Sequence, residues 1–472
     1  MPFPVLGSNS AVAEFAIDNS LRFNDDDSAR LSRSQTNGNQ DKWTWSVWVK
    51  RGNISSDQCF FATSNGSTTS FDAKFKSSDA IEIYNYFGGG FDSQLITNRL
   101  FRDVSAWYHI VVVYDSGNAT ESDRLQIYIN GTEETSFSTT NYPSLNADSD
   151  LNVSGSTLDI GRQQNGSQFF DGYMSEINFV DGQALAPTEF GETNDNGVWI
   201  PKAYSGTYGT NGFFLQFQDS SNLGDDTSGN GNDFTATNLT ATDQTTDTPT
   251  NNFATMNPVH KSIYGTNNLP TFSEGNVKIA MNTDTSTSST IAPASGKWYV
   301  EYKQSENTAD NSGYPIVGIS ATLGGAAGDI IGFRTPSGSN YRGQLGTSSI
   351  DNAFLSARLS GDIFGFYIDL DNSTLIIHKN GSTYMNTGYT GGLDWSSGLT
   401  TTNTQTGFYH FYVQNNASGT PAFTDEVNFG NPSFSISSSN SDANGYGSFE
   451  YSPTLGGTNY YALCTKNLAE YG

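Results

Sequence analysis

Basic residues are scarce in this chain of 472 residues. Lys and Arg together number 22 against 48 Asp and Glu, which gives a formal net charge of −26. A chain this acidic repels phosphate backbones and anionic lipid headgroups, so we expect neither nucleic acid nor an acidic membrane as a partner. No run of about 18 apolar residues occurs, so the sequence predicts no membrane insertion.

Cysteine and helix-forming patterns are equally sparse. The two cysteines, Cys59 and Cys464, lie far apart without metal-ligand spacing, so disulfides are not expected to hold the fold. Cys59 sits in an apolar run with two phenylalanines and is expected to be buried. Charged residues make up only 15% of the chain, and no long segment carries a helical period. Helical bundles and coiled coils are therefore excluded.

We also expect no export signal. The first 20 residues contain no basic residue and no continuous apolar run of the kind that a signal peptide needs. The long Ser-, Thr- and Asn-rich segments nevertheless suit a surface protein. We therefore expect assembly inside a cell into a particle that is later released.

What the chain does contain is many short strand patterns. In the segment 43–49, Trp43, Trp45 and Val47 fall on one face and Trp48 on the other. The segment 107–115 is apolar almost throughout and predicts a central strand buried on both faces. Such patterns recur between turn signals, so we expect an all-β protein of two β-sandwiches in tandem.

The expected organisation has four parts. Residues 1–15 contain two prolines and predict an extended N-terminal arm. Residues 16–240 form the first sandwich, 241–270 a polar linker and 271–472 the second sandwich. The two sandwiches echo each other, since Leu-x-Ile-x-x-Asn-Gly occurs at 125–131 and again at 375–381. Each copy predicts a hairpin that turns at Asn-Gly.

Several blocks resemble known families. The segments 107–115, 125–131, 160–162 and 170–177 look like a laminin-G-like, concanavalin A-like jelly roll. The segments 296–301, 317–319, 361–369 and 375–381 resemble a SPRY-type sandwich. The terminal segment 461–468 looks like the tail of this arrangement in marine tailed-bacteriophage virion proteins.

The resemblance implies a non-enzymatic virion structural protein. Its place would be the virion surface after assembly in the host cytoplasm, as a tail fibre, a tail appendage or a head decoration. Its expected partners are other virion proteins, a host-surface glycan and further copies of itself. We expect a homotrimer, because several copies on one particle raise the avidity of weak sugar sites. A polysaccharide hydrolase or lyase on a jelly-roll fold, and a cell-surface adhesin, are the alternatives.

Two sets of candidate ligand-binding residues stand out. Hard oxygen ligands for Ca²⁺ cluster in one Gly-hinged loop, at Asp225, Asp226, Asn230, Asn232 and Asp233. An Asx-rich turn held by its own hydrogen bonds is the alternative interpretation. Aromatic faces that stack on sugar rings are expected at strand ends, together with one Arg: Tyr84, Tyr86, Phe87, Tyr341 and Arg342.

Catalytic residues are not expected. Glycan hydrolysis needs two carboxylates facing each other across a cleft. The acids considered, Asp171, Glu176 and Glu301, do not form the E-x-D-x-x-E triplet of glycosidases on this fold. The four histidines are scattered, so Ser-His-Asp chemistry is not indicated either.

Overall fold

The computed structural model describes two compact units. The described residues are 15–64, 69–163, 166–260, 270–282, 285–304, 315–321, 330–334, 342–346, 348–350, 353–354, 360–398, 406–415 and 423–472. The first unit runs to Thr250 and also includes Ser273–Gly275, and the second contains the rest of the described chain from Asn251. The expected arm, residues 1–15, lies outside the described residues except for Phe15.

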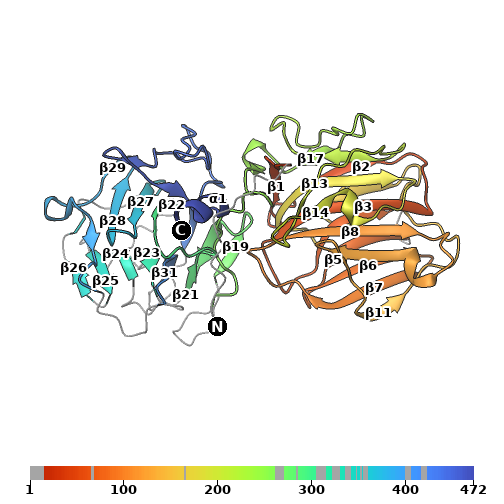
Figure 1. Cartoon of the computed structure of the whole chain (residues 1–472), viewed down its shortest axis with the longest axis horizontal. Coiled ribbons are helices and arrows are strands. Elements are labelled where there is room, and N and C mark those ends of the chain that lie inside the picture. The colour runs from red at the N-terminus through yellow and green to blue at the C-terminus, as the bar shows by residue number, and fades with distance from the viewer. Residues whose placement is uncertain are drawn as a thin grey trace. The chain divides into compact units, whose positions relative to one another are not determined.

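The first unit is built on two antiparallel sheets, which we call A and B (Figure 1). Sheet A contains, in spatial order, β10 (Thr132–Glu133), β9 (Leu125–Ile129), β8 (Trp107–Asp115), β3 (Lys42–Arg51), β13 (Gly172–Asp181), β1 (Ser20–Phe23) and β18 (Gln244–Thr245), and β16 (Phe213–Leu215) pairs with β13. Sheet B contains β11 (Phe137–Asn141), β7 (Gly90–Leu100), β6 (Ala80–Phe87), β5 (Thr69–Phe75), β4 (Gln58–Ser64), β12 (Thr157–Ile160), β2 (Arg30–Ser34) and β17 (Thr235–Thr237). Short elements outside these sheets are η1 (Glu121–Arg124), η2 (Pro187–Glu189), η3 (Ala241–Asp243), and the hairpin of β14 (Gly191–Thr193) and β15 (Trp199–Pro201).

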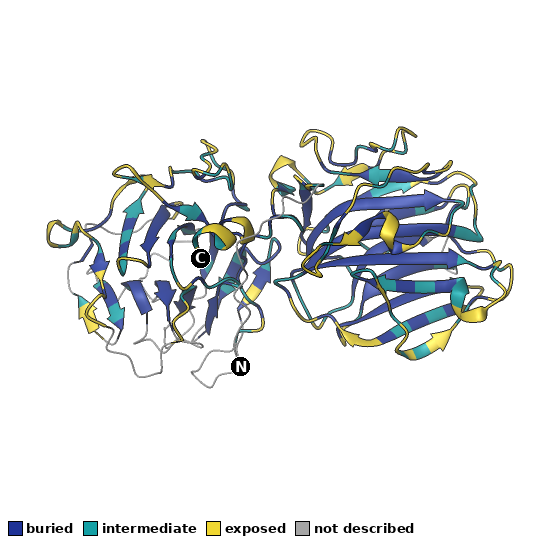
Figure 2. Cartoon of the chain, in the orientation of Figure 1, coloured by how far each residue is buried: buried dark blue, intermediate teal, exposed yellow. Residues whose placement is uncertain are grey.

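An aromatic core fills the space between sheets A and B. Trp43 stacks on Tyr114 with ring centroids 5.4 Å apart, and Trp45 stacks on Phe61 at 4.7 Å. Both tryptophans are fully buried, as their position in the alternating strand predicts. Strand β8 is buried along nearly its whole length, which confirms the predicted central strand (Figure 2). Buried rings of this size supply much of the hydrophobic stabilisation of a sandwich.

The outer face of sheet A is covered by the chain itself. Val111, Val180 and Phe190 form one apolar cluster there, and Trp48 packs in a second. Asp247 also lies against this face, where it forms a buried ion pair of 2.7 Å with Lys50. Because β18 joins sheet A, residues 241–250 form part of the first unit and do not belong to a free linker. Their buried threonines carry no apolar period, so the sequence gives no strand signal there.

The second unit also pairs two sheets, C and D. Sheet C contains β19 (Thr271–Ser273), β20 (Lys278–Met281), β32 (Phe423–Asn428), β22 (Lys297–Gln304), β27 (Ile363–Asp369), β28 (Thr374–Lys379) and β29 (Ser382–Thr383), with β30 (Leu393–Asp394) on β28 and β35 (Tyr461–Ala462) on β22. Sheet D contains β21 (Thr285–Ser288), β31 (His410–Asn415), β23 (Pro315–Ser320), β24 (Ile330–Arg334), β25 (Arg342–Gly346) and β26 (Ser348–Ile350). The remaining elements are η4 (Thr387–Tyr389), the pair β33 (Thr454–Leu455) and β34 (Thr458–Asn459), and α1 (Thr465–Tyr471).

The predicted all-β fold of two sandwiches is confirmed. Strands dominate both units, and α1 is the one α-helix in the described part of the chain. No helix of the described residues is long and apolar enough to cross a membrane. Cys59 and Cys464 are both buried free thiols, and the predicted burial of Cys59 is confirmed.

The Asn-Gly echo of the sequence marks the same hairpin in both units. Asn130 and Asn380 adopt left-handed φ values of +50° and +51°. The side chain of Asn130 accepts a hydrogen bond from the backbone N–H of His109 at 2.8 Å, and that of Asn380 accepts from Ile363 at 2.9 Å. Each asparagine therefore ties its turn to the strand that comes before the hairpin, β8 in the first unit and β27 in the second.

Candidate functional site

The outer face of sheet B collects polar side chains. Paired residues of neighbouring antiparallel strands point to the same side, and successive residues along one strand alternate. Phe71, Ala73 and Phe75 of β5 point into the core, so the residues between them point outward. Register places one outward row across the sheet, from β7 to β2: Gln94, Tyr84, Asp72, Ala62, Asp159 and Ser32.

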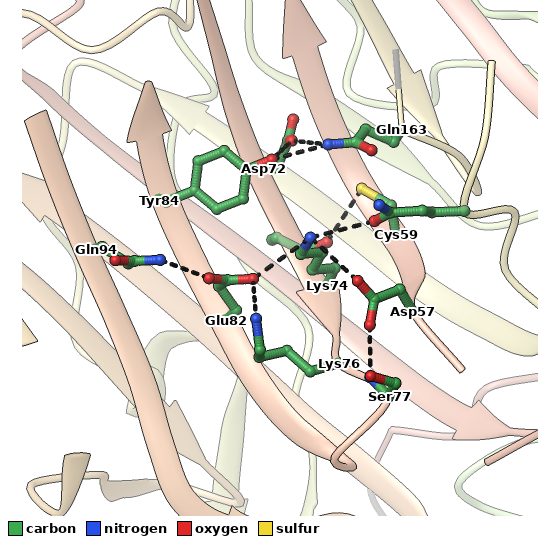
Figure 3. A network of polar contacts seen from close by, with 12 residues as sticks. Asp57, Cys59, Asp72, Lys74, Lys76, Ser77, Glu82, Tyr84, Gln94 and Gln163 are labelled. Atoms are coloured by element: carbon green, nitrogen blue, oxygen red, sulfur yellow. Dashed lines mark hydrogen bonds and ion pairs between the residues drawn. The ribbon is translucent and has the colours of Figure 1, made fainter. Parts of the chain in front are cut away.

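Asp72 lies in the middle of this row and is fully buried. Its Oδ2 accepts hydrogen bonds from the Tyr84 hydroxyl and from Nε2 of Gln163, which is 2.7 Å away (Figure 3). Burial raises the pKa of Asp72, and burial followed by the charge of Asp72 raises the pKa of Tyr84. The other oxygen of Asp72 and Oε1 of Gln163 are buried and have no hydrogen-bond partner among the described residues. Within that part of the chain, two buried acceptor oxygens of this face thus lack a donor.

Glu82, in the adjacent outward row, binds three donors. Its carboxylate accepts from Nζ of Lys76 at 2.8 Å and from Nε2 of Gln94 at 2.6 Å, and it lies 3.4 Å from Nζ of Lys74 (Figure 3). Lys74 in turn donates to Oε1 of Gln168 at 3.2 Å. Charges on this face are therefore paired within the face.

Exposed aromatic rings stand at the β6–β7 hairpin, at one end of sheet B. Strands β6 and β7 are joined by Gly88 and Gly89, whose φ values of +59° and +97° suit the tight hairpin turn that glycine allows. The flanking Phe87 is 62% exposed and Phe91 is 48% exposed. Two exposed aromatic side chains close together at one hairpin make this end of the sheet a candidate contact site.

A β-bulge at Asp92 sets the direction of Phe91. Asn85 pairs with Ser93 and Tyr86 pairs with Phe91, so Asp92 is the extra residue. The shift places Phe91 on the outer face beside Tyr86, with ring centroids 5.3 Å apart. Phe91 thus joins Tyr86 in a small aromatic platform at the edge of the polar rows.

The structure separates the five predicted glycan-binding residues. Tyr86 and Phe87 lie at the hairpin, whereas Tyr84 is buried and its hydroxyl is engaged by Asp72. Arg342 is half-buried in β25 of the second unit, and Tyr341 lies outside the described residues. The first-unit residues are the ones that adjoin a polar face.

Sequence reasoning missed four residues of this face. They are Phe91, Gln94, Gln163 and Glu82. The alternation in 69–75 and 80–87 could have placed Glu82 on an outward face. The bulge and the position of Gln163, which reaches Asp72 from a loop after β12, carry no sequence signal that we recognise.

The predicted calcium loop follows β16 and is closed by its own hydrogen bonds. The Asp226 carboxylate accepts from the backbone N–H groups of Phe214 and Asn232, each at 2.8 Å. The side-chain amides of Asn230 and Asn232 donate to the carbonyl of Gly212 at 2.9 and 2.8 Å. Across the described residues, no three His, Cys, Asp or Glu side chains converge as a metal site requires. Binding of Ca²⁺ by this loop, with Asp225 and Asp233, stays a prediction.

The three acids considered for catalysis, Glu176, Asp171 and Glu301, each make different contacts. Glu176 has a φ of +50° at a bulge of β13, and burial followed by the charge of Asp18 raises its pKa to about 8. Asp171 is fully buried and accepts from the backbone N–H of Gly275 at 3.0 Å. Glu301, in the second unit, accepts from Asn428 at 3.0 Å and is fully buried. The expectation of no enzymatic activity stays a prediction.

One known family model matches part of this chain. Residues 23–190 match the family model described as the concanavalin A-like lectin/glucanases superfamily. This match confirms the predicted laminin-G-like domain over those residues. No curated protein matches the chain.

Several solved structures are similar to this chain, all at low identity and low TM-score. Domains LG4-5 of the mouse laminin α1 chain are similar over 88% of this chain and 88% of that chain, at 9% identity and a TM-score of 0.30. A pentraxin from Limulus polyphemus aligns over 36% of this chain and 78% of its own, at 16% identity and a TM-score of 0.27. The SPRY domain of human HERC1 aligns over 32% of this chain and 86% of its own, at 14% identity and a TM-score of 0.23. Scores this low carry no argument about function.

Proposed function

We propose that the outer face of sheet B binds carbohydrate without chemically changing it. The observation that carries the proposal is the exposed ring of Phe91 beside Tyr86, at the edge of rows of hydrogen-bonding side chains. Sugar rings have apolar faces and polar rims, so a ligand of this kind needs both an aromatic surface and oriented polar groups. The family description of residues 23–190 as concanavalin A-like lectin/glucanases is consistent with carbohydrate binding.

The proposal predicts that Phe91→Ala weakens glycan binding. Loss of the stacking surface should lower affinity about tenfold, or ~1.4 kcal/mol, for the glycans that the wild-type protein binds on an array. Phe408→Ala is the matched control, because Phe408 is equally exposed at 48% but belongs to the second unit. Equal binding by the two variants would exclude this platform as the site.

We also propose that the protein is a non-enzymatic surface component of a tailed-phage virion. Support comes from the pairing of a laminin-G-like domain with a SPRY-like one and from the resemblance of the C-terminal segment. In this role it attaches the particle to host glycans as a homotrimer, anchored to other virion proteins. Locating the chain in a density map of an intact particle tests this proposal, and single unpaired copies there would contradict the trimer.

A further inference from the structure

We infer that this face selects glycans by hydrogen-bond polarity: it takes neutral or amino sugars and rejects glycans that bind through carboxylate or sulfate groups. The inference rests on the proposed function and specifies its ligand class. It follows from which atoms of the face remain available after the internal hydrogen bonds are made.

Gln94 presents an acceptor to solvent. A carboxylate can only accept hydrogen bonds, so the amide nitrogen of Gln94 must be the atom that faces Glu82, at 2.6 Å. This arrangement orients the carbonyl Oε1 of Gln94 away from Glu82. Gln94 is half-buried in the outward row that begins beside the aromatic platform, so this oxygen lies where a bound sugar would meet it.

Gln163 is oriented by the same rule. Its Nε2 donates to Oδ2 of Asp72 at 2.7 Å and contacts the Tyr84 hydroxyl at 2.8 Å, while the Tyr84 hydrogen is directed to Asp72. The amide nitrogen of Gln163 is thus engaged, and within the part of the chain that the structure describes its Oε1 and Oδ1 of Asp72 are buried without a donor. Gln94 therefore turns an acceptor, not a donor, toward a ligand, and the buried oxygens of Gln163 and Asp72 add only negative partial charge to this face.

The nearby cations are engaged as well. Lys76 is bound to Glu82, and Lys74 lies between Glu82 at 3.4 Å, Asp57 at 3.5 Å and Oε1 of Gln168 at 3.2 Å (Figure 3). Exposed Asp92 adds a negative charge beside Phe91. A carboxylate or sulfate placed here meets acceptors and negative charge, whereas hydroxyl and ammonium groups meet the acceptors they need.

The first test is an array that carries neutral, amino, uronic and sulfated glycans, probed with the full chain. We expect every bound glycan to be neutral or to carry amino groups. Binding confined to uronic or sulfated glycans would overturn the inference and leave the proposed function standing. No binding to any glycan would contradict the proposed function itself, and the inference with it.

The second test reverses the polarity of one position. Gln94→Lys keeps a donor toward Glu82 but removes the outward acceptor, so affinity for the neutral hits should fall about tenfold. Gln126→Lys is the matched control, since Gln126 also donates to a carboxylate, Glu133 at 3.1 Å, but lies in sheet A. Gln94→Leu should show the same loss without adding charge. Unchanged neutral-glycan binding by both Gln94 variants, with unchanged thermal unfolding, would overturn the inference.

Discussion

At the residue scale, a side chain that can only donate hydrogen bonds determines which nitrogen of a neighbouring histidine carries the hydrogen. Trp199 Nε1–H can only donate, so Nδ1 of His109, 3.0 Å away, must accept and Nε2 must carry the hydrogen that points to Ser46, at 2.8 Å. The ring also stacks on Trp48 at 4.7 Å, and burial lowers the pKa of His109 to about 3. His109 is therefore a neutral packing residue at physiological pH, as a histidine in a buried strand is expected to be.

Glu176 makes folding stability depend on pH. Its pKa of about 8 in the folded protein exceeds the ~4.3 of an unfolded Glu, so the folded state holds the extra proton between these values. Stability from this group is therefore lost as pH rises through that window. Glu176→Gln removes this pH dependence. Measured by thermal or denaturant unfolding, the free energy of unfolding of the variant minus that of the wild type should rise by about 1–3 kcal/mol from pH 5 to pH 8.

Glu450→Gln is the control for this pH dependence. Hydrogen bonds from Ser437 lower the pKa of Glu450 despite some burial, so its titration lies below the window. Its difference from wild type should stay flat between pH 5 and pH 8. A Glu176→Gln difference that is equally flat would contradict the assigned protonation.

At the element scale, the Asn-Gly hairpins show how much the sequence predicts. The repeated spacing identified both turns, and alternation identified β3, β8 and the inward tryptophans. Register and bulges were not predictable, because they depend on pairing with strands distant in sequence. One extra residue at Asp92 decides which side Phe91 faces, and nothing local distinguishes it from a regular strand residue. The proposed binding face was therefore only half predicted.

Gly131 in the first hairpin should tolerate no side chain. Its φ is +77°, and a Cβ there would lie 2.4 Å from the Trp199 ring. Gly197 has the same φ of +77°, but an added Cβ would have no atom within 4 Å, so Gly197→Ala measures the cost of backbone strain alone. We expect Gly197→Ala to cost about 1 kcal/mol and Gly131→Ala about 2–4 kcal/mol in the free energy of unfolding. Equal losses in denaturant titrations would show that the Trp199 contact carries no cost.

At the scale of the whole molecule, the first unit differs on its two outer faces. The chain covers sheet A with apolar clusters and a buried ion pair, whereas sheet B carries the paired charges, oriented amides and exposed rings. The centre of the sheet B face is buried as well, since Ala62 and Asp72 are fully buried, so the exposed Phe91 and the half-buried Gln94 mark the accessible part of the proposed binding face. With a net charge of −26, the molecule as a whole disfavours anionic ligands, in agreement with the polarity of this face.

The central claim is tested most directly by a crystal structure of the full chain in complex with the glycan that binds most strongly on the array. The account predicts a sugar ring stacked at Tyr86 and Phe91, with a hydroxyl or amino group within hydrogen-bond distance of the Gln94 carbonyl oxygen. A glycan bound at any other surface, with this face empty, would contradict it.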